Sequence, residues 1–437
     1  MPPVLPFAGL RYVVPAADLE HLVSPPFDVI NSEEQAQLLA ASPHNVIRLE
    51  LPADAPDQPG SRYRLAAKYL REWREARVLR PDSNAAYYLS ETEYTYANAT
   101  TRRRDLLAAV AVEPWSARVA LPHEHTMAAP KADRLELLRA THLNASPIWL
   151  LARERLPALD QAWELADTRP PDVEFAWRGE THRLWVVTDR SLIERLQAAL
   201  AASGPLYIAD GHHRYETSLA FKSEAGGQVK AAGATLATIT LADDPGLQVL
   251  PTHRLLSGLS PELTLEEAET RWGEAFHVEY YPVWDNAPAE QIDAFIEQLA
   301  SSGRLGPSFG IYGLGQPDLF GILELRGRKP PPNSLPADRS MAWQSLDVSM
   351  LHELLIDPLV AESGHPRAEV LRFTRDPHEA VDEVRRGRAS VAFFLNPTPV
   401  QSVLAVADAG DLMPEKSTYF YPKPPAGLVM RDLETLP

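Results

Sequence analysis

The sequence predicts an α/β fold, of the α+β type with mixed sheets, divided between two domains. Short apolar or alternating runs typical of strands are interspersed along the chain with segments of helical spacing. The 437 residues exceed the size of one ordinary core, since a domain usually holds about 100–200 residues. Hydrophobic residues make up 45% and charged residues 23% of the chain, which is typical of folded globular proteins.

The first predicted domain covers residues 1–258. Residues 85–96 alternate in hydropathy and residues 106–112 form an apolar run, so we expect two paired strands. Arg102–Asp105 lie between them, and such a charged stretch is typical of a solvated turn. Residues 206–209 predict a short buried strand. Helical spacing or composition is found at residues 35–41, 63–75, 132–143, 191–202 and 215–222.

The second predicted domain covers residues 259–437 and begins a new alternation of helices and strands, as expected for helices packed on a sheet. The proline-rich stretch at residues 328–337 predicts a loop within it. The predicted helices are residues 265–276, 289–300, 347–360, 378–387 and 400–407, and the predicted strands are residues 278–281, 309–312, 320–325, 370–374 and 390–395.

Composition excludes several classes of protein. The chain has no cysteine, which rules out disulfides, thiolate nucleophiles and zinc sites built on sulfur. No signal peptide and no apolar run long enough to span a membrane are evident, so we expect a cytoplasmic protein without a membrane partner. The formal net charge of -17 repels polyanions. The expected partner is therefore a small molecule and not nucleic acid.

The stretch Asp210-Gly211-His212-His213-Arg214 is the strongest candidate site. It follows a predicted buried strand and opens a predicted helix, which places free backbone N–H groups and the positive end of the helix dipole at one point. Gly211 permits close approach of the backbone, and Arg214 can grip phosphate oxygens. His212 and His213 can donate hydrogen bonds or move a proton. The alternative is that Asp210 caps the helix and the histidines are structural.

A second cluster is Pro122-His123-Glu124-His125-Thr126. If this segment is extended, His123 and His125 share one face and Glu124 lies on the other. The two imidazoles can serve phosphate binding or proton transfer, or only hydrogen bonding within the protein. They could also share a metal ion, but no third ligand is evident and we predict no metal site.

Three further segments carry candidate residues. Lys131 can reach a phosphate as a point charge, or it can belong to a solvated helix start. Lys416 opens a stretch, 416–423, of lysines and aromatic residues that suits either nucleobase stacking or a docking tail. Asp28, after Pro25-Pro26, is presented by an extended segment as a base or metal ligand, although a plain turn is equally compatible. The familiar nucleotide motifs, GxxxxGK[ST] and GxGxxG, are absent.

Several long strings resemble a bacterial and archaeal family filed as domain of unknown function 1015. The resemblance covers nearly the whole chain. The strings are SPPFDVI (24–30), HNVIRLEL (44–51), PHEHTMAAPKADRLELLRAT (122–141), YIADGHHRYETS (207–218), LPTHRL (250–255), LDVSMLHE (346–353), FFLNPTP (393–399) and MPEKSTYFYPK (413–423).

The GHHR turn of this chain also resembles the phosphate-binding turn of the ParB/sulfiredoxin superfamily, which includes kinases that phosphorylate free serine. That resemblance implies a ParB/sulfiredoxin-like N-terminal core in which Gly211, His212, His213 and Arg214 hold nucleotide phosphates. A carboxylate would be the base for the substrate hydroxyl; the candidates are Asp28, Glu124 and Asp210.

The expected function is therefore an ATP- or ADP-dependent kinase, with Mg²⁺, that acts on a small hydroxylated metabolite such as L-serine. Two alternatives come from other classes of protein. One is a nucleotide sensor that binds without catalysis, and the other is a metal-dependent hydrolase built on His123 and His125. The complete set of candidate site residues is Asp28, His123, Glu124, His125, Lys131, Asp210, Gly211, His212, His213, Arg214 and Lys416.

Overall fold

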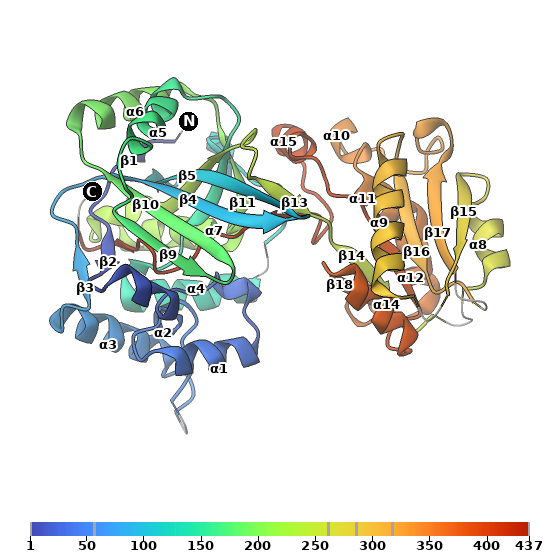
Figure 1. Ribbon diagram of the computed structural model, residues 1–437, viewed down its shortest axis with the longest axis horizontal. Helices are drawn as coiled ribbons and strands as arrows, with labels where there is room; N and C mark the ends of the chain where they lie inside the picture. Colours follow the sequence, from blue (N-terminus) through green and yellow to red (C-terminus); the bar gives the residue numbers. More distant parts are fainter. Residues whose placement is uncertain are drawn as a thin grey trace. The chain divides into compact units, whose positions relative to one another are not determined.

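The protein forms two compact units (Figure 1), described here from a computed structural model. The structure describes residues 2–55, 58–126, 128–259, 263–284, 287–315 and 319–435, without the side chains of Ala128, Ala129 and Arg328. Unit 1 consists of Met1–Gln248 and Pro422–Pro437, and unit 2 of Val249–Tyr421. The expected boundary after residue 258 thus lies within unit 2, and the C-terminal segment belongs to unit 1. The α/β class with mixed sheets is confirmed.

Unit 1 is built on a sheet of nine described strands. Strand β11 is parallel to β6 and β12 is parallel to β8, whereas the remaining neighbours are antiparallel. The order is β6 (Ala120–Leu121), β11 (Leu206–Asp210), β8 (Ile148–Ala152), β12 (Ala234–Leu241), β5 (Ala99–Ala111), β4 (Tyr87–Tyr96), β10 (Glu180–Val187) and β9 (Val173–Trp177), with β1 (Val4–Leu5) beside β5.

Two small sheets and seven α-helices complete the described part of unit 1. Strand β2 (Leu10–Tyr12) pairs with β3 (Leu79–Pro81), and β7 (Leu143–Asn144) pairs with β21 (Arg431–Asp432). The helices are α1 (Ser32–Ala41), α2 (Ile47–Glu50), α3 (Arg62–Glu75), α4 (Ala128–Thr141), α5 (Pro157–Ala166), α6 (Arg190–Ala202) and α7 (His212–Ala225).

Alternate residues of the large sheet enter opposite cores, because successive strand side chains point to opposite faces. Leu106 of β5 belongs to the cluster that includes Trp163 of α5 and Leu196 of α6. Its neighbour Leu107 belongs to the cluster that includes Leu70 and Trp73 of α3. The sheet is therefore covered on both faces.

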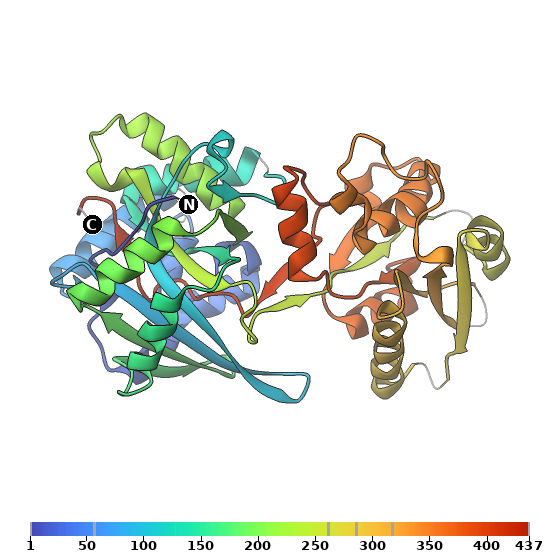
Figure 2. The same ribbon diagram turned by 90° about the horizontal axis from the view of Figure 1, so that it is seen from above.

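The predicted strand pair is confirmed, but the predicted turn between its members is wrong. Strands β4 and β5 pair antiparallel, with Tyr88 opposite Leu107, and form a long hairpin (Figure 2). Arg102–Asp105 lie inside β5, and the positive-φ residues Ala97 and Asn98 make the turn instead. Arg103 and Asp105 are buried and ion-paired, with Arg103 Nη2 2.8 Å from Asp105 Oδ2. The turn prediction assumed that charged residues face solvent, but Arg103 and Asp105 are buried within the strand because they pair with each other.

Unit 2 is built on an antiparallel sheet of six described strands. Helices α9 and α14 cover one face, with Phe295 of α9 stacked on Phe320 of β17 at 4.4 Å between ring centroids. The strand order is β15 (Phe276–Pro282), β17 (Leu319–Leu325), β16 (Ser308–Tyr312), β19 (Val391–Phe394), β14 (His253–Leu256) and β18 (Leu371–Thr374).

The helices predicted for unit 2 are present, with shifted ends. The predicted helix 347–360 is divided, because a π-helical turn at His352–Ile356 separates two α-helical segments. The observed α-helices are α8 (Leu265–Trp272), α9 (Ala289–Gly303), α10 (Met341–Gln344), α11 (Asp347–Leu351), α12 (Asp357–Ser363), α13 (Arg367–Val370), α14 (Pro377–Arg385) and α15 (Val400–Asp408), and a two-stranded sheet pairs β13 (Gln248–Leu250) with β20 (Tyr419–Tyr421). Of the helices that the structure describes, none is both long and apolar enough to cross a membrane.

The buried Arg103–Asp105 pair gives a test of the fold. We expect Asp105→Asn to lower the free energy of unfolding by about 3–5 kcal/mol, because Arg103 would remain buried without its carboxylate. Asp167→Asn removes an exposed partner of Arg104 and should cost no more than about 1 kcal/mol. Urea denaturation of the two variants measures the difference, and equal losses would contradict the structural role of the buried pair.

Candidate functional site

The candidate site is the junction of β11, Gly211 and α7. The strand ends at Asp210, Gly211 adopts the left-handed conformation with φ 92°, and α7 begins at His212. In the described part of the chain no side chain caps the helix, and the first helical hydrogen bond is donated by Tyr215 N to Gly211 O. The N–H groups of residues 212–214 therefore point out of the N-terminus of α7, where the helix dipole is positive.

Gly211 is required by its surroundings as well as by its backbone. A Cβ atom at this position would lie 3.0 Å from Arg214 Nε and 3.1 Å from the guanidinium carbon. The guanidinium would therefore have to shift by a few tenths of an ångström to admit a Cβ atom. The turn and the Arg214 side chain form one packed unit.

Asp210 is a buried anion held between two cations. Its Oδ2 lies 2.5 Å from Arg214 Nη2, and its Oδ1 accepts a bond from Lys423 Nζ. Burial alone would raise the pKa of Asp210, but the charges of Lys423 and Arg214 outweigh burial and lower that pKa to about 2. A carboxylate of such low pKa is a poor proton acceptor at neutral pH, so Asp210 does not suit the role of catalytic base that we considered for it.

Arg214 does not present its guanidinium as an open fork, and this corrects the expectation from the sequence. Its Nη1 donates to Pro147 O and lies 3.2 Å from Ser146 Oγ, while Nη2 binds Asp210. Only about a tenth of the side chain is exposed. The i,i+4 ion pair with Asp210 and the carbonyl before β8 draw the side chain inward. Arg214 thus supports the turn from behind.

His212 and His123 are buried neutral imidazoles. His123 Nδ1 donates to Ile208 O at 2.8 Å, and His123 N donates to His212 Nε2 at 3.3 Å. The accepting role of Nε2 places the His212 proton on Nδ1. Burial lowers the pKa of His123 to about 4, and burial, followed by the neighbouring His123, lowers the pKa of His212 well below its usual range. His212 thus offers a neutral N–H donor at the turn.

Glu124 lies at the open side of this pair. Its Oε2 is 3.9 Å from His212 Nδ1, and about a third of its side chain is exposed. The distance exceeds that of a hydrogen bond, so His212 faces the carboxylate without holding it closely. Glu124 is the carboxylate among the three base candidates that combines contact with the turn and access to solvent.

The expected common face for His123 and His125 is wrong. His123 is only 2% exposed, whereas His125 is an exposed residue. The chain bends at Glu124 instead of remaining extended, so the two side chains lie in different surroundings. This geometry removes the basis of the metal-dependent hydrolase. Over the ranges given above, no group of three or more histidine or carboxylate side chains is placed to hold a metal ion.

Lys131 lies beside α7 but is already paired. Its Nζ is 2.7 Å from Glu216 Oε2, which also accepts a bond from Thr126 Oγ1 at 2.8 Å. Glu216 follows His212 by four residues, so this pair lies about one helical turn from the N-terminus of α7. Lys131 thus borders the candidate site and can supply a positive charge only from its edge.

Two predicted residues are not part of this junction as the structure describes it. Asp28 is an exposed residue of a short 3-10 helix, Phe27–Val29, and not of an extended segment. Lys416 is an exposed residue of unit 2, whereas the junction is built from unit 1. The residues that the structure brings together are His123, Glu124, Asp210, Gly211, His212, His213 and Arg214, with Lys131 at their border.

Sequence reasoning missed Lys423, Ser146 and Glu216. Lys423 stands in the same lysine and aromatic stretch as Lys416, but it is the lysine that reaches Asp210. The stretch itself was a usable signal, since it is one of the strings shared with the family. Nothing local in the sequence marks Ser146 or Glu216, because each acts through a partner that is distant in the chain.

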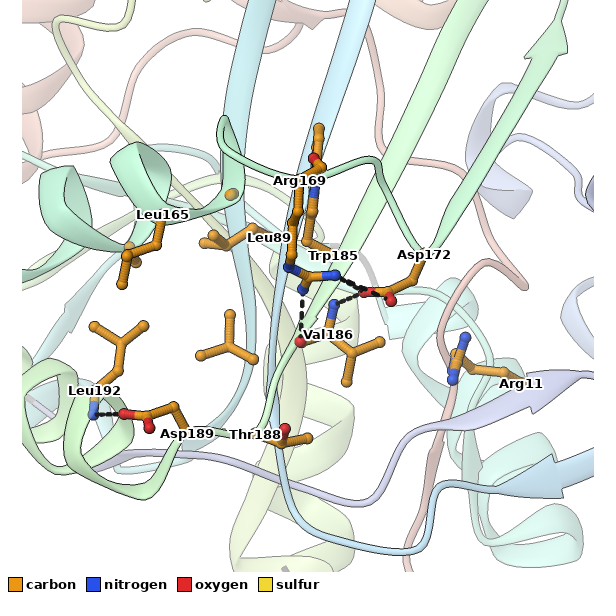
Figure 3. Close-up of a pocket in the computed structure, with 13 residues that line it drawn as sticks. Arg11, Leu89, Leu165, Arg169, Asp172, Trp185, Val186, Thr188, Asp189 and Leu192 are labelled. Carbon is orange, nitrogen blue, oxygen red and sulfur yellow. Dashed lines mark hydrogen bonds and ion pairs between the residues drawn. The ribbon is translucent and has the colours of Figure 1, made fainter.

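A larger cavity of unit 1 lies elsewhere, beside β10 between α5 and α6 (Figure 3). It measures about 610 Å³, and Leu165 and Leu192 line one side of it. On its polar side, Arg169 is bound to Asp172 and to Val186 O, and Arg11 is bound to Asp82. These arginines are used within the protein, and β10 is separated from β11 by four strands of the sheet. Volume alone therefore does not identify the functional site.

The ion pairs of Asp210 predict a specific loss of stability in acid. The pKa of about 2 lies below the unfolded value of about 3.9, so the stabilisation is complete above pH 5 and disappears toward pH 2. We expect the difference in unfolding free energy between the wild-type protein and Asp210→Asn to shrink by roughly 2 kcal/mol across that interval. Denaturant titrations at several pH values measure this difference. A difference that does not change with pH would contradict the assigned ion pairs.

The packing of Gly211 predicts an unequal pair of glycine substitutions. Gly227, at the other end of α7, also has positive φ, but a Cβ there would meet nothing within 4 Å. Gly227→Ala should therefore show only the backbone cost of about 1–2 kcal/mol, whereas Gly211→Ala adds contact with the Arg214 guanidinium. Thermal unfolding should rank Gly211→Ala as the less stable variant, and the reverse order would contradict this packing.

Comparison with known proteins gives a family and several distant structures. The family model described as "Protein of unknown function (DUF1015)" matches residues 4–349. No curated protein matches the chain. A free serine kinase in complex with AMP is similar over 72% of this chain and 88% of its own, at 14% identity and a TM-score of 0.34. A conserved hypothetical protein from Pyrococcus furiosus is similar over 72% of this chain and 93% of its own, at 13% identity and a TM-score of 0.33.

Proposed function

This chain belongs to the DUF1015 family of proteins of unknown function, and we propose that it is a nucleotide-dependent kinase of a small hydroxylated metabolite. The observation that carries the proposal is the N-terminus of α7, which no side chain of the described residues caps and which lies beside the partly exposed Glu124. Phosphoryl transfer needs a place for phosphate oxygens and a carboxylate near the accepting hydroxyl, and this junction offers both.

The phosphate oxygens of the nucleotide bind at the N-terminus of α7, where the backbone N–H groups of the first helical turn and the positive end of the helix dipole meet. The buried charges around the turn favour an anion there, since Lys423 and Arg214 together carry two positive charges against the one negative charge of Asp210. This local excess stands against the formal net charge of -17 of the whole chain. Arg214 keeps Gly211 in place, so the N–H groups are oriented before the ligand arrives.

Glu124 is the proposed base. The hydroxyl oxygen of the substrate attacks the terminal phosphorus, a new O–P bond forms, and the bond between that phosphorus and the nucleotide oxygen breaks. The hydroxyl proton passes to Glu124. His212 remains neutral, and its Nδ1–H faces either Glu124 or a phosphate oxygen. His213, the next residue of α7, is assigned to the phosphates only by the resemblance of the GHHR turn.

A Mg²⁺ ion bound with the nucleotide would neutralise phosphate charge. The residues of the junction fit such an ion only in part, because Glu124 is the single carboxylate at its open side in the portion of the chain that the structure describes. Most ligands of the ion would therefore come from phosphate and water, as is usual for Mg²⁺ at phosphates.

The test is a phosphotransfer assay with the purified protein, ATP or ADP, Mg²⁺ and a panel of hydroxylated amino acids. L-serine is the first substrate to try, because the GHHR turn resembles that of the superfamily that includes free-serine kinases. Glu124→Gln should lower turnover by about 10²–10⁴-fold and leave nucleotide binding close to wild type. Glu136→Gln, at an exposed position of α4, is the matched control and should retain full activity.

Two outcomes decide against the proposal. If the wild-type protein neither binds nucleotide nor forms a phosphorylated product, the kinase assignment is wrong. If it binds nucleotide but never turns over with any hydroxylated substrate, it is a non-catalytic nucleotide sensor instead.

A further inference from the structure

A groove between α4 and α7 begins next to the phosphate-binding end of α7. It measures about 390 Å³ and is lined by Trp115 together with residues of the two helices. We propose that this groove holds the base of the bound nucleotide against Trp115. The proposal rests on the proposed function, and it assigns a further part of the same ligand.

Polarity changes along the groove in the order that a nucleotide requires. The end near His212 carries the Lys131–Glu216 ion pair, which lies about 6 Å along the helix from the first turn of α7. Beyond it the lining is largely apolar, with Leu135, Leu219 and Ala220. A nucleotide has the same sequence of groups: charged phosphates, a ribose with two hydroxyls, and a flat, largely apolar base.

Three residues of α7 hold Trp115 and the backbone just before it in place. Its ring stacks on Tyr215 at 4.7 Å with an interplanar angle of 20°, and its Nε1 donates to Glu216 Oε1 at 3.1 Å. The Tyr215 hydroxyl donates to Glu113 O and Lys222 Nζ donates to Val112 O, just before Trp115. The indole is thus an ordered wall, and an ordered aromatic wall suits stacking of a base because little freedom is lost on binding.

A second observation concerns Thr217, which also lines the groove. It is 4% exposed, and its Oγ1 has no hydrogen-bond partner in the part of the chain that the structure describes. A buried hydroxyl without a partner costs free energy, so such groups are usually satisfied by a ligand or by water. The ring nitrogens or exocyclic groups of a base would provide a partner for this hydroxyl.

The test separates the base from the phosphates by comparing ADP with inorganic tripolyphosphate as calorimetric ligands. Ala220→Phe fills the groove, and Trp115→Leu removes the stacking surface while keeping an apolar side chain. Each change should weaken ADP binding roughly ten-fold or more and leave tripolyphosphate binding unchanged. Ala201→Phe, at an exposed position of α6, is the matched control and should bind ADP as the wild-type protein does. Thermal unfolding of every variant confirms that the fold is retained.

The outcomes are distinguishable. If ADP binds Ala220→Phe and Trp115→Leu as tightly as the wild-type protein, the base lies elsewhere and this inference is overturned, while the proposed function stands. If the two folded variants lose ADP and tripolyphosphate equally, the groove does not serve the base, and the inference also fails. If the wild-type protein binds neither ligand, the proposed function fails and the inference fails with it.

Discussion

The buried carboxylate of Asp210, held between Lys423 and Arg214, is the interaction on which the rest of the junction depends. An isolated carboxylate at this depth would be costly, and the two cations beside Asp210 offset that cost. The three groups together join the turn between β11 and α7 to a segment that is distant in the sequence and returns to unit 1 at Pro422. The geometry of the turn is therefore a consequence of long-range pairing as much as of local sequence.

A third buried cation, Arg103, anchors the segment that contains Lys423. Arg103 of β5 binds Asp105, lies 4.3 Å from the Trp149 ring and donates to Pro422 O, one residue before Lys423. The lysine thus reaches Asp210 from a backbone that is itself anchored in the sheet. This arrangement explains why the excess positive charge is fixed in place at the N-terminus of α7, in a protein whose overall charge is strongly negative. A fixed charge favours an anion without the cost of ordering a flexible side chain on binding.

Much of this fold could be predicted from sequence because local periodicity reports local burial. The leucine spacing of α6 and the apolar run of β11 were sufficient for both elements. The Arg102–Asp105 stretch was misread, since charged residues usually indicate solvent, and only the tertiary contacts of Arg103 reveal a buried pair. In the candidate site, too, the local elements could be predicted and the long-range contacts could not. The strand, Gly211 and the helix start were readable, whereas the inward direction of Arg214 depends on Ser146 and Pro147, which are far away in the sequence.

The most direct test is whether the phosphates of the nucleotide bind at the N-terminus of α7, and amide NMR measures this. Titration of tripolyphosphate into the labelled protein should shift the backbone amide signals of His212, His213 and Arg214 saturably and before those of other residues. Saturable shifts confined to another part of the chain, or no shifts at millimolar ligand, would contradict the account.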